Sequence, residues 1–218
     1  MKKFHRLTAY ILIIFVAAHL INHLFLIAGR ENYNQVQEIL NAVYRNPMLE
    51  PILIIAMSFQ VIIGLKLAIS SLRRKPKRPF WQRPFWEKAQ IISGFVFAYF
   101  IIEHLIALAG VRWFNPNLET SFYWPASVMN GAPFTYYFVP YYFLGVLAVM
   151  THMGIGLRFV ALRKGKRALG DMLAIGAIVL GAVFGTLIIL SLMGVFYEIT
   201  LPAKWIDYLI MFYPDYTG

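Results

Sequence analysis

Histidines inside apolar stretches are the residues of this chain whose type and position could support chemistry. His19 and His23 lie in the first apolar run, His104 in the third and His152 in the fourth. Ionisable groups are costly inside a bilayer and usually serve a function there. An imidazole can carry a proton or ligate a metal through a ring nitrogen. We therefore ask which elements could bring these rings together.

Five apolar runs are long enough to span a bilayer, roughly 7–28, 51–72, 89–110, 135–160 and 172–197. Apolar residues make up 60% of the chain and charged residues 14%, which excludes an ordinary soluble domain. We predict a single all-α integral membrane domain over residues 1–218, with five transmembrane helices. The first run is too long for a signal peptide. Segments 31–45 and 202–213 have the pattern of amphipathic helices in the outer interface.

The net charge of +10 is distributed asymmetrically along the chain. Four of the lysines and arginines lie next to the ends of the apolar runs on one side of the predicted membrane, namely Arg30, Arg45, Arg112 and Lys204. The other sixteen lie next to the ends on the opposite side. This is the positive-inside pattern, so we predict a cytoplasmic N-terminus, an external C-terminus and no nucleic-acid partner. The basic side is Lys2, Lys3, Arg6, Lys66, Arg73, Arg74, Lys75, Lys77, Arg78, Arg83, Lys88, Arg158, Arg163, Lys164, Lys166 and Arg167.

The first four runs contain an internal repeat. The His-Leu-Ile that begins at His19 returns at His104, and Gln60 followed by Gly64-Leu-Lys corresponds to His152 followed by Gly156-Leu-Arg. The repeat predicts a four-helix bundle with a pseudo-two-fold axis and one peripheral helix. At 1.5 Å per residue, His19 and His104 lie about 18 and 24 Å from the inner ends of their helices. They therefore form an outer site, and Gln60 and His152 form an inner one.

Two imidazoles from opposing helices at one depth are the ligands of a six-coordinate b-type haem. We predict that His19 and His104 ligate one haem, with Arg30 or Arg112 pairing its propionates. Gly64 and Gly156 would let a flat macrocycle pack closely at the inner level. Gln60 is a poor ligand, so the inner site holds no haem, or holds one on His152 alone, or Gln60 forms a hydrogen bond elsewhere. A structural role, in which Gln60 and His152 bond to each other across the bundle, is also open.

Two further polar residues each have functional interpretations and a structural one. His23 is an alternative ligand, a propionate partner or part of a quinone site, or else a polar residue at the interface. Glu103 exchanges protons with a bound quinol, or pairs with a neighbouring polar group. The sequence has no cysteine, which excludes cysteine-ligated clusters and covalent haem. It also has no hydrolase, zinc-protease or phosphate-loop motif.

These features resemble a known family, the five-helix dihaem cytochrome b anchor of succinate dehydrogenases and fumarate reductases (succinate:quinone oxidoreductases). The similar segments are Ala18-His19-Leu20 with Gly29 and Tyr33-Asn34, Phe59 to Gly64, Ser93-Gly94 through His104, and Leu144 to Leu157. The family has histidine where this chain has Gln60. The resemblance implies a non-catalytic subunit of an oxidoreductase in a bacterial inner membrane, with separate flavoprotein and iron–sulfur subunits.

The expected function is electron transfer between haem b and membrane quinone. Three alternatives remain open on the residues: a cofactor-poor scaffold or assembly subunit, a sensor with five-coordinate haem on His152, and a subunit of another membrane complex.

Overall fold

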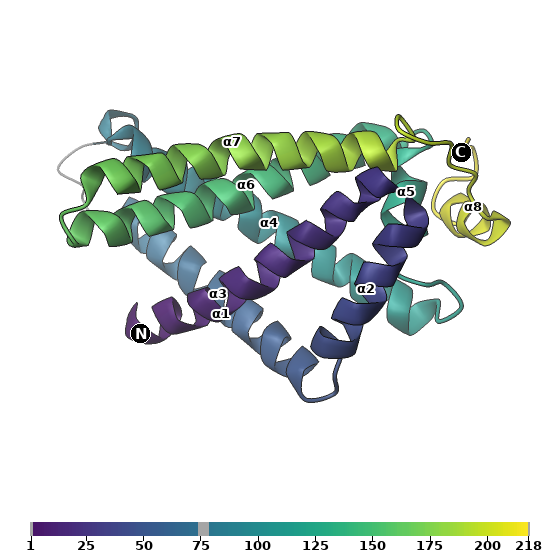
Figure 1. Cartoon of the computed structure of the whole chain (residues 1–218), viewed down its shortest axis with the longest axis horizontal. Helices are drawn as coiled ribbons and strands as arrows, with labels where there is room; N and C mark the ends of the chain where they lie inside the picture. Colours follow the sequence, from purple (N-terminus) through teal and green to yellow (C-terminus); the bar gives the residue numbers. More distant parts are fainter. Residues whose placement is uncertain (1, 74–78, 218) are drawn as a thin grey trace.

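The described part of the chain is built from helices. A computed structural model describes residues 2–73 and 79–217, with side chains from residue 8 onward. In this part, five helices are long and apolar enough to cross a membrane (Figure 1): α1 (Lys2–Leu24, continued by η1, Phe25–Ala28), α3 (Leu49–Arg73), α4 (Phe85–Phe114), α6 (Phe134–Arg163) and α7 (Arg167–Leu192). The predicted all-α class with five such helices is confirmed, and it indicates a multi-pass membrane protein.

Short helices gather at the end of the molecule away from the turn between α6 and α7 (Figure 1). They are α2 (Arg30–Tyr44), α5 (Tyr123–Met129) and α8 (Ala203–Ile210), and η2 (Phe80–Gln82) lies near the opposite end. Gly29 has φ 99°, a conformation that favours glycine, and it turns the chain from η1 into α2. The fifth long helix ends at Leu192 rather than at 197, because Gly194 at φ 75° turns the chain there.

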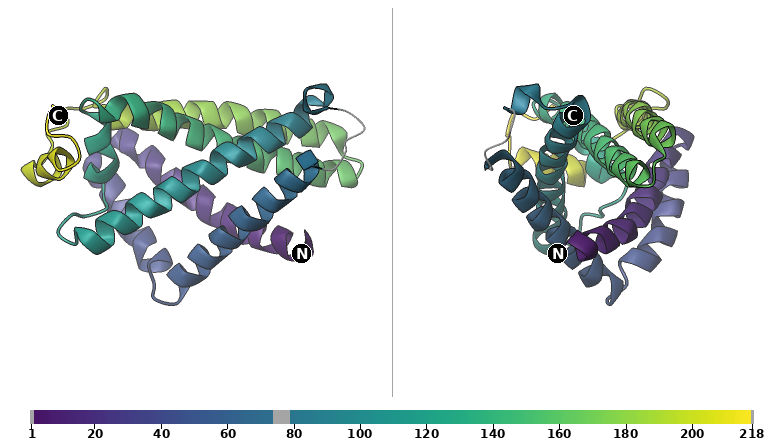
Figure 2. Two further views of the ribbon diagram at one scale, coloured as in Figure 1. Left: turned by 180° about the vertical axis from the view of Figure 1, so that it is seen from behind. Right: turned by 90° about the vertical axis from the view of Figure 1, so that its left-hand side faces the viewer.

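Helices α6 and α7 form a close antiparallel pair (Figure 2). Small residues permit the close approach: a Cβ at Gly154 would overlap the Cβ of Ala177, and one at Gly181 would lie 2.8 Å from Met150 Cβ. Glycine contacts of this kind are how membrane helices gain packing without a hydrophobic driving force. The α6–α7 pair is therefore the most tightly packed unit of the fold.

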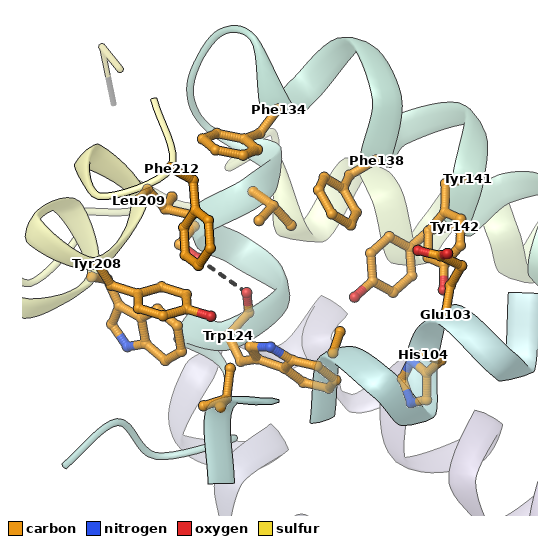
Figure 3. Close-up of a pocket in the computed structure, with 15 residues that line it drawn as sticks. Glu103, His104, Trp124, Phe134, Phe138, Tyr141, Tyr142, Tyr208, Leu209 and Phe212 are labelled. Atoms are coloured by element: carbon orange, nitrogen blue, oxygen red, sulfur yellow. Dashed lines mark hydrogen bonds between the residues drawn. The ribbon is translucent and has the colours of Figure 1, made fainter. Parts of the chain in front are cut away.

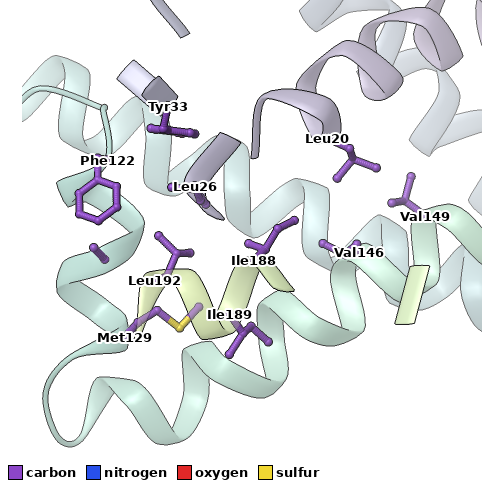
Figure 4. Close-up of a cluster of buried hydrophobic side chains, with 11 residues drawn as sticks. Leu20, Leu26, Tyr33, Phe122, Met129, Val146, Val149, Ile188, Ile189 and Leu192 are labelled. Carbon is purple, nitrogen blue, oxygen red and sulfur yellow. The ribbon is translucent and has the colours of Figure 1, made fainter. Parts of the chain in front are cut away.

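The main core brings α7 together with α1, α5 and α6 (Figure 4). Leu20 of α1 and Leu26 of η1 cluster with Ile188 and Leu192 of α7, and all four are buried. Since α7 contributes to this core, it is less peripheral than the repeat predicts. The four-helix bundle with two-fold symmetry stays a prediction.

Helices α3 and α4 differ in how they are held. Within α3, all of which is described, only Ala56 and Ile63 are buried, so most of its surface faces outward. Helix α4 packs on α6 through Gly145, where a Cβ would overlap the ring of Phe100. This contact fixes the part of α4 that precedes His104.

A buried arginine joins three helices at the basic end. Arg158 of α6 is 7% exposed, and its Nε lies 2.6 Å from Asp171 Oδ1 of α7. Its guanidinium also lies 4.9 Å from the centre of the Trp86 ring of α4. The pair and the cation–π contact together compensate the buried charge. Of the predicted basic side, Arg74, Lys75, Lys77 and Arg78 lie outside the described residues, as do the side chains of Lys2, Lys3 and Arg6.

Candidate functional site

Three histidines from two helices distant in sequence meet near the α2 end of the molecule. The ring centroids of His19 on α1 and His104 on α4 are 6.2 Å apart, and the ring planes are inclined by 75°. His23 lies one turn after His19, with its Nε2 atom 3.3 Å from His19 Nε2. The structure thus brings together the two rings that the repeat pairs.

The spacing of His19 and His104 suits two ligands of one metal. Nitrogens of two imidazoles on one ion lie about 4 Å apart, because each bond is about 2 Å long. With each ring centroid roughly 1 Å behind its nitrogen, the centroids lie about 6 Å apart. Among the described residues, no group of three or more His, Cys, Asp or Glu is placed to hold a metal ion. A bis-imidazole haem requires only two protein ligands.

Two ring nitrogens of the cluster are buried without a partner. Within the described part of the chain, His19 Nδ1 and His23 Nδ1 make no hydrogen bond. A buried polar atom left in this state is destabilising by about 1–3 kcal/mol. The two nitrogens therefore favour a bound group that uses the histidine cluster, and on this observation and the ring spacing the residues fit a haem.

A phenylalanine supports each of the paired imidazoles. Phe15 stacks on His19 with centroids 5.7 Å apart and an interplanar angle of 15°, and Phe100 stacks on His104 at 5.6 Å and 19°. Each phenylalanine precedes its histidine by four residues, one turn along the same helix face. The sequence analysis missed these residues, although Phe-x-x-x-His-Leu-Ile in both copies of the repeat is a signal that could have found them.

Two more aromatic residues close the site from outside the long helices. Tyr33 of α2 is 3% exposed and stacks on His23 at 5.6 Å. Burial, followed by the nearby phenols of Tyr44 and Tyr142, raises the pKa of Tyr33 well above its usual range. Trp124 of α5 lies 5.3 Å from the ring of His104. We call the cluster formed by these side chains and the three histidines the histidine chamber.

The inner residues Gln60 and His152 have separate neighbours. Gln60 donates a hydrogen bond to Thr8 Oγ1 of α1 at 2.7 Å. His152 lies against α4, with its Nδ1 atom 3.2 Å from Gln90 Nε2 and its ring over Gly94, where a Cβ would be 3.1 Å away. The structure therefore directs Gln60 toward α1 and His152 toward α4.

Room exists beside the two glycines of the inner level. A Cβ added at Gly64 or Gly156 would meet no other described part of the chain within 4 Å. This open space is compatible with a flat ligand at the inner level.

The two arginines predicted to pair with propionates lie in different places. Arg112, in the last turn of α4, forms an ion pair with Glu50 at the start of α3. Arg30 forms a hydrogen bond with the Tyr123 hydroxyl and lies 5.4 Å from the centre of that ring. It lines a separate surface groove of about 450 Å³ between α2 and the segment after α7.

Glu103 borders a cavity of about 160 Å³ on the other side of His104 (Figure 3). The cavity lies between α4, α5, α6 and α8, and its walls are mainly aromatic. Its polar groups include the Tyr141 and Tyr142 hydroxyls beside Glu103. His104 and Trp124 thus belong to the histidine chamber and also line this cavity. Trp205 of α8, which is 1% exposed, anchors the outer wall.

No protein-family model, curated protein or solved structure matches this chain.

Proposed function

We propose that the chain is a membrane electron-transfer subunit that holds a b-type haem between His19 and His104. The observation that carries this proposal is the approach of these two rings to 6.2 Å from helices more than eighty residues apart in the chain. A haem with both axial positions filled by imidazole carries one electron reversibly.

The residues around the two ligands would keep the site rigid and dry. Phe15 and Phe100 restrict rotation of the imidazoles by stacking on them. Tyr33 and Trp124 cover the side toward α2 and α5, which limits access of water to the chamber. A ligand pair held in this way needs little reorganisation when the charge of the site changes. His23 contacts His19 directly through the Nε2 atoms of the two rings, and its tautomer determines whether it donates or accepts the hydrogen bond.

The cavity beside Glu103 is the proposed quinone site. Its aromatic walls suit a flat ring, and Glu103 and the Tyr142 hydroxyl offer hydrogen-bonding groups to its oxygens, whereas the Tyr141 hydroxyl donates to the Phe100 carbonyl. Glu103 can accept a proton from a quinol, a role that a carboxylate performs when it lies within hydrogen-bond reach. Because His104 borders both spaces, electrons would cross a short distance between quinone and haem.

Glu103→Gln tests the proposed proton acceptor. We expect haem content to be unchanged and reduction of the haem by a membrane quinol to slow by about 100-fold, since the amide cannot take the proton. The rate is measured by stopped-flow absorbance in detergent. Glu119→Gln, in the exposed loop before α5, is the matched control and should reduce at the wild-type rate. Equal rates in all three proteins would remove Glu103 from the proposal.

A second haem at the inner level would have to be ligated by His152. Both ring nitrogens of that residue lie 3.2 Å from Gln90 Nε2, so the Gln90 side chain would have to move away first, while Gln60 bonds Thr8. This chain would lie in a bacterial inner membrane. Its soluble partners would be flavoprotein and iron–sulfur subunits that bind to the basic face. Electron flow would then run between that face and the quinone cavity.

A reduced-minus-oxidised spectrum with haem stoichiometry tests the central claim. We expect the protein purified from haem-replete cells to show the α-band of a six-coordinate haem b, with at least one haem per chain. A protein with no haem would instead be a scaffold that retains the bundle. A reduced protein that binds carbon monoxide at its only haem would be a five-coordinate sensor.

A further inference from the structure

A pair of arginines lies where the end of α2, the start of α3 and the end of α4 come together. Arg45 caps the C-terminus of α2, and Arg112 ends α4. The start of α3, with Glu50, and the segment before α5, with Thr120, complete this corner. Four segments that are separate in the sequence therefore place polar groups close together at this corner.

The charges at this corner do not balance. Arg112 is paired with Glu50, to which a second nitrogen also lies at 3.4 Å. Arg45 donates to the neutral hydroxyl of Thr120 at 2.5 Å and makes no salt bridge to any described residue. Partial burial, and then the nearby charge of Arg112, lower the pKa of Arg45, while Tyr44, the Glu50 carboxylate and Tyr33 act in the opposite direction. Two partly buried guanidinium groups and one carboxylate leave a net positive charge at this corner, which a further anion would compensate.

Contacts connect Arg45 to the histidines. Its neighbour Tyr44 packs edge-on against Phe15, with centroids 5.3 Å apart, and Phe15 stacks on His19. The charge of Arg45 also acts on Tyr33, whose pKa it lowers against the larger effect of burial. Tyr33 in turn stacks on His23. Arg45 is therefore at the edge of the histidine chamber, whereas Arg30 lies against Tyr123 on the surface.

We propose that Arg45, together with Arg112, binds a carboxylate of the ligand in the histidine chamber, namely a haem propionate. This inference rests on the proposed haem site, and it adds a residue that neither the repeat nor the histidine pattern indicates. A guanidinium binds a carboxylate through two parallel hydrogen bonds, which gives orientation as well as affinity. Helix α2 would then serve to hold Arg45 above the ligand.

Arg45→Gln tests the proposal, with Arg163→Gln, an exposed arginine in the last turn of α6, as the control. We expect the Arg45 variant to bind haem about tenfold more weakly in reconstitution of the apoprotein, as for loss of a charge-assisted hydrogen bond. Its haem should also have a lower midpoint potential, because a cation that disfavours the oxidised iron is removed. Arg163→Gln should keep the wild-type affinity and potential.

Haem dimethyl ester, which has no free propionate, separates this role from a purely structural one. The wild type should bind the ester about as weakly as Arg45→Gln does, and the substitution should cause no further loss. An Arg45 variant that keeps wild-type haem affinity and potential would overturn the inference. So would equal weakening for haem and for the ester, or a variant that only loses co-purifying anionic phospholipid. Failure of the wild type to bind haem would instead remove the proposed function.

Discussion

Replacing His104 with alanine is expected to remove the outer haem from the purified protein while the helices remain folded. Among the described residues, His104 is the one histidine of the cluster that comes from α4, and a six-coordinate haem needs an imidazole on each of its faces. The number of haems per chain, measured by the pyridine haemochrome assay, should fall by one. The spectrum should lose the α-band of the haem held by His19 and His104. Circular dichroism should be unchanged.

Glu103→Gln provides the matched control for that loss, because it alters the neighbouring residue of the same turn. We expect it to retain the wild-type haem stoichiometry. If His104→Ala keeps the wild-type spectrum, the ligand assignment is wrong. If the wild type and both variants contain no haem and assemble equally well, the histidines have a structural role only.

Gly154→Leu is expected to give the largest loss of stability among the variants proposed for this protein. Gly154 faces Ala177 across the α6–α7 contact, and even a Cβ would overlap its neighbour there. The larger side chain must push apart two helices that the core depends on, which is destabilising by about 1–3 kcal/mol or more. Thermal unfolding in detergent, followed by circular dichroism, should show a lower midpoint.

The control for this change is Gly176→Leu on α7, since a Cβ at Gly176 would meet no other described part of the chain within 4 Å. It has the same change of residue type and the same effect on helix propensity. Its unfolding midpoint should stay close to that of the wild type. Equal midpoints for the two variants would show that the α6–α7 contact is not the stabilising one.

The long helices and the main histidine pair were predictable from the sequence, and for physical reasons. Hydrophobic length determines which segments can span a bilayer, so α3 and α6 lie close to their predicted bounds. Depth along a helix follows from a constant rise, so His19 and His104 could be placed at similar levels. Contacts between residues of one helix can be predicted in the same way. Phe15 and Phe100 could have been identified from their four-residue spacing to His19 and His104.

Contacts made by connecting segments were not predictable in the same way. Tyr33 and Arg45 reach the histidine chamber because Gly29 turns α2 back over the long helices, and no periodicity in the sequence specifies the direction of that turn. The packing of α7 was not predictable for a related reason. The repeat contains no counterpart of α7 and therefore indicates no packing partner for it. In the fold, small residues of α6 and α7 face each other and let the two helices pack closely.

The composition of the core has a consequence for biosynthesis. Leu20 and Leu26 are buried by Ile188 and Leu192, which leave the ribosome much later because synthesis proceeds from the N-terminus. Helix α1 is therefore made long before its packing partner on α7 exists. This core can close only after α7 has been synthesised and inserted.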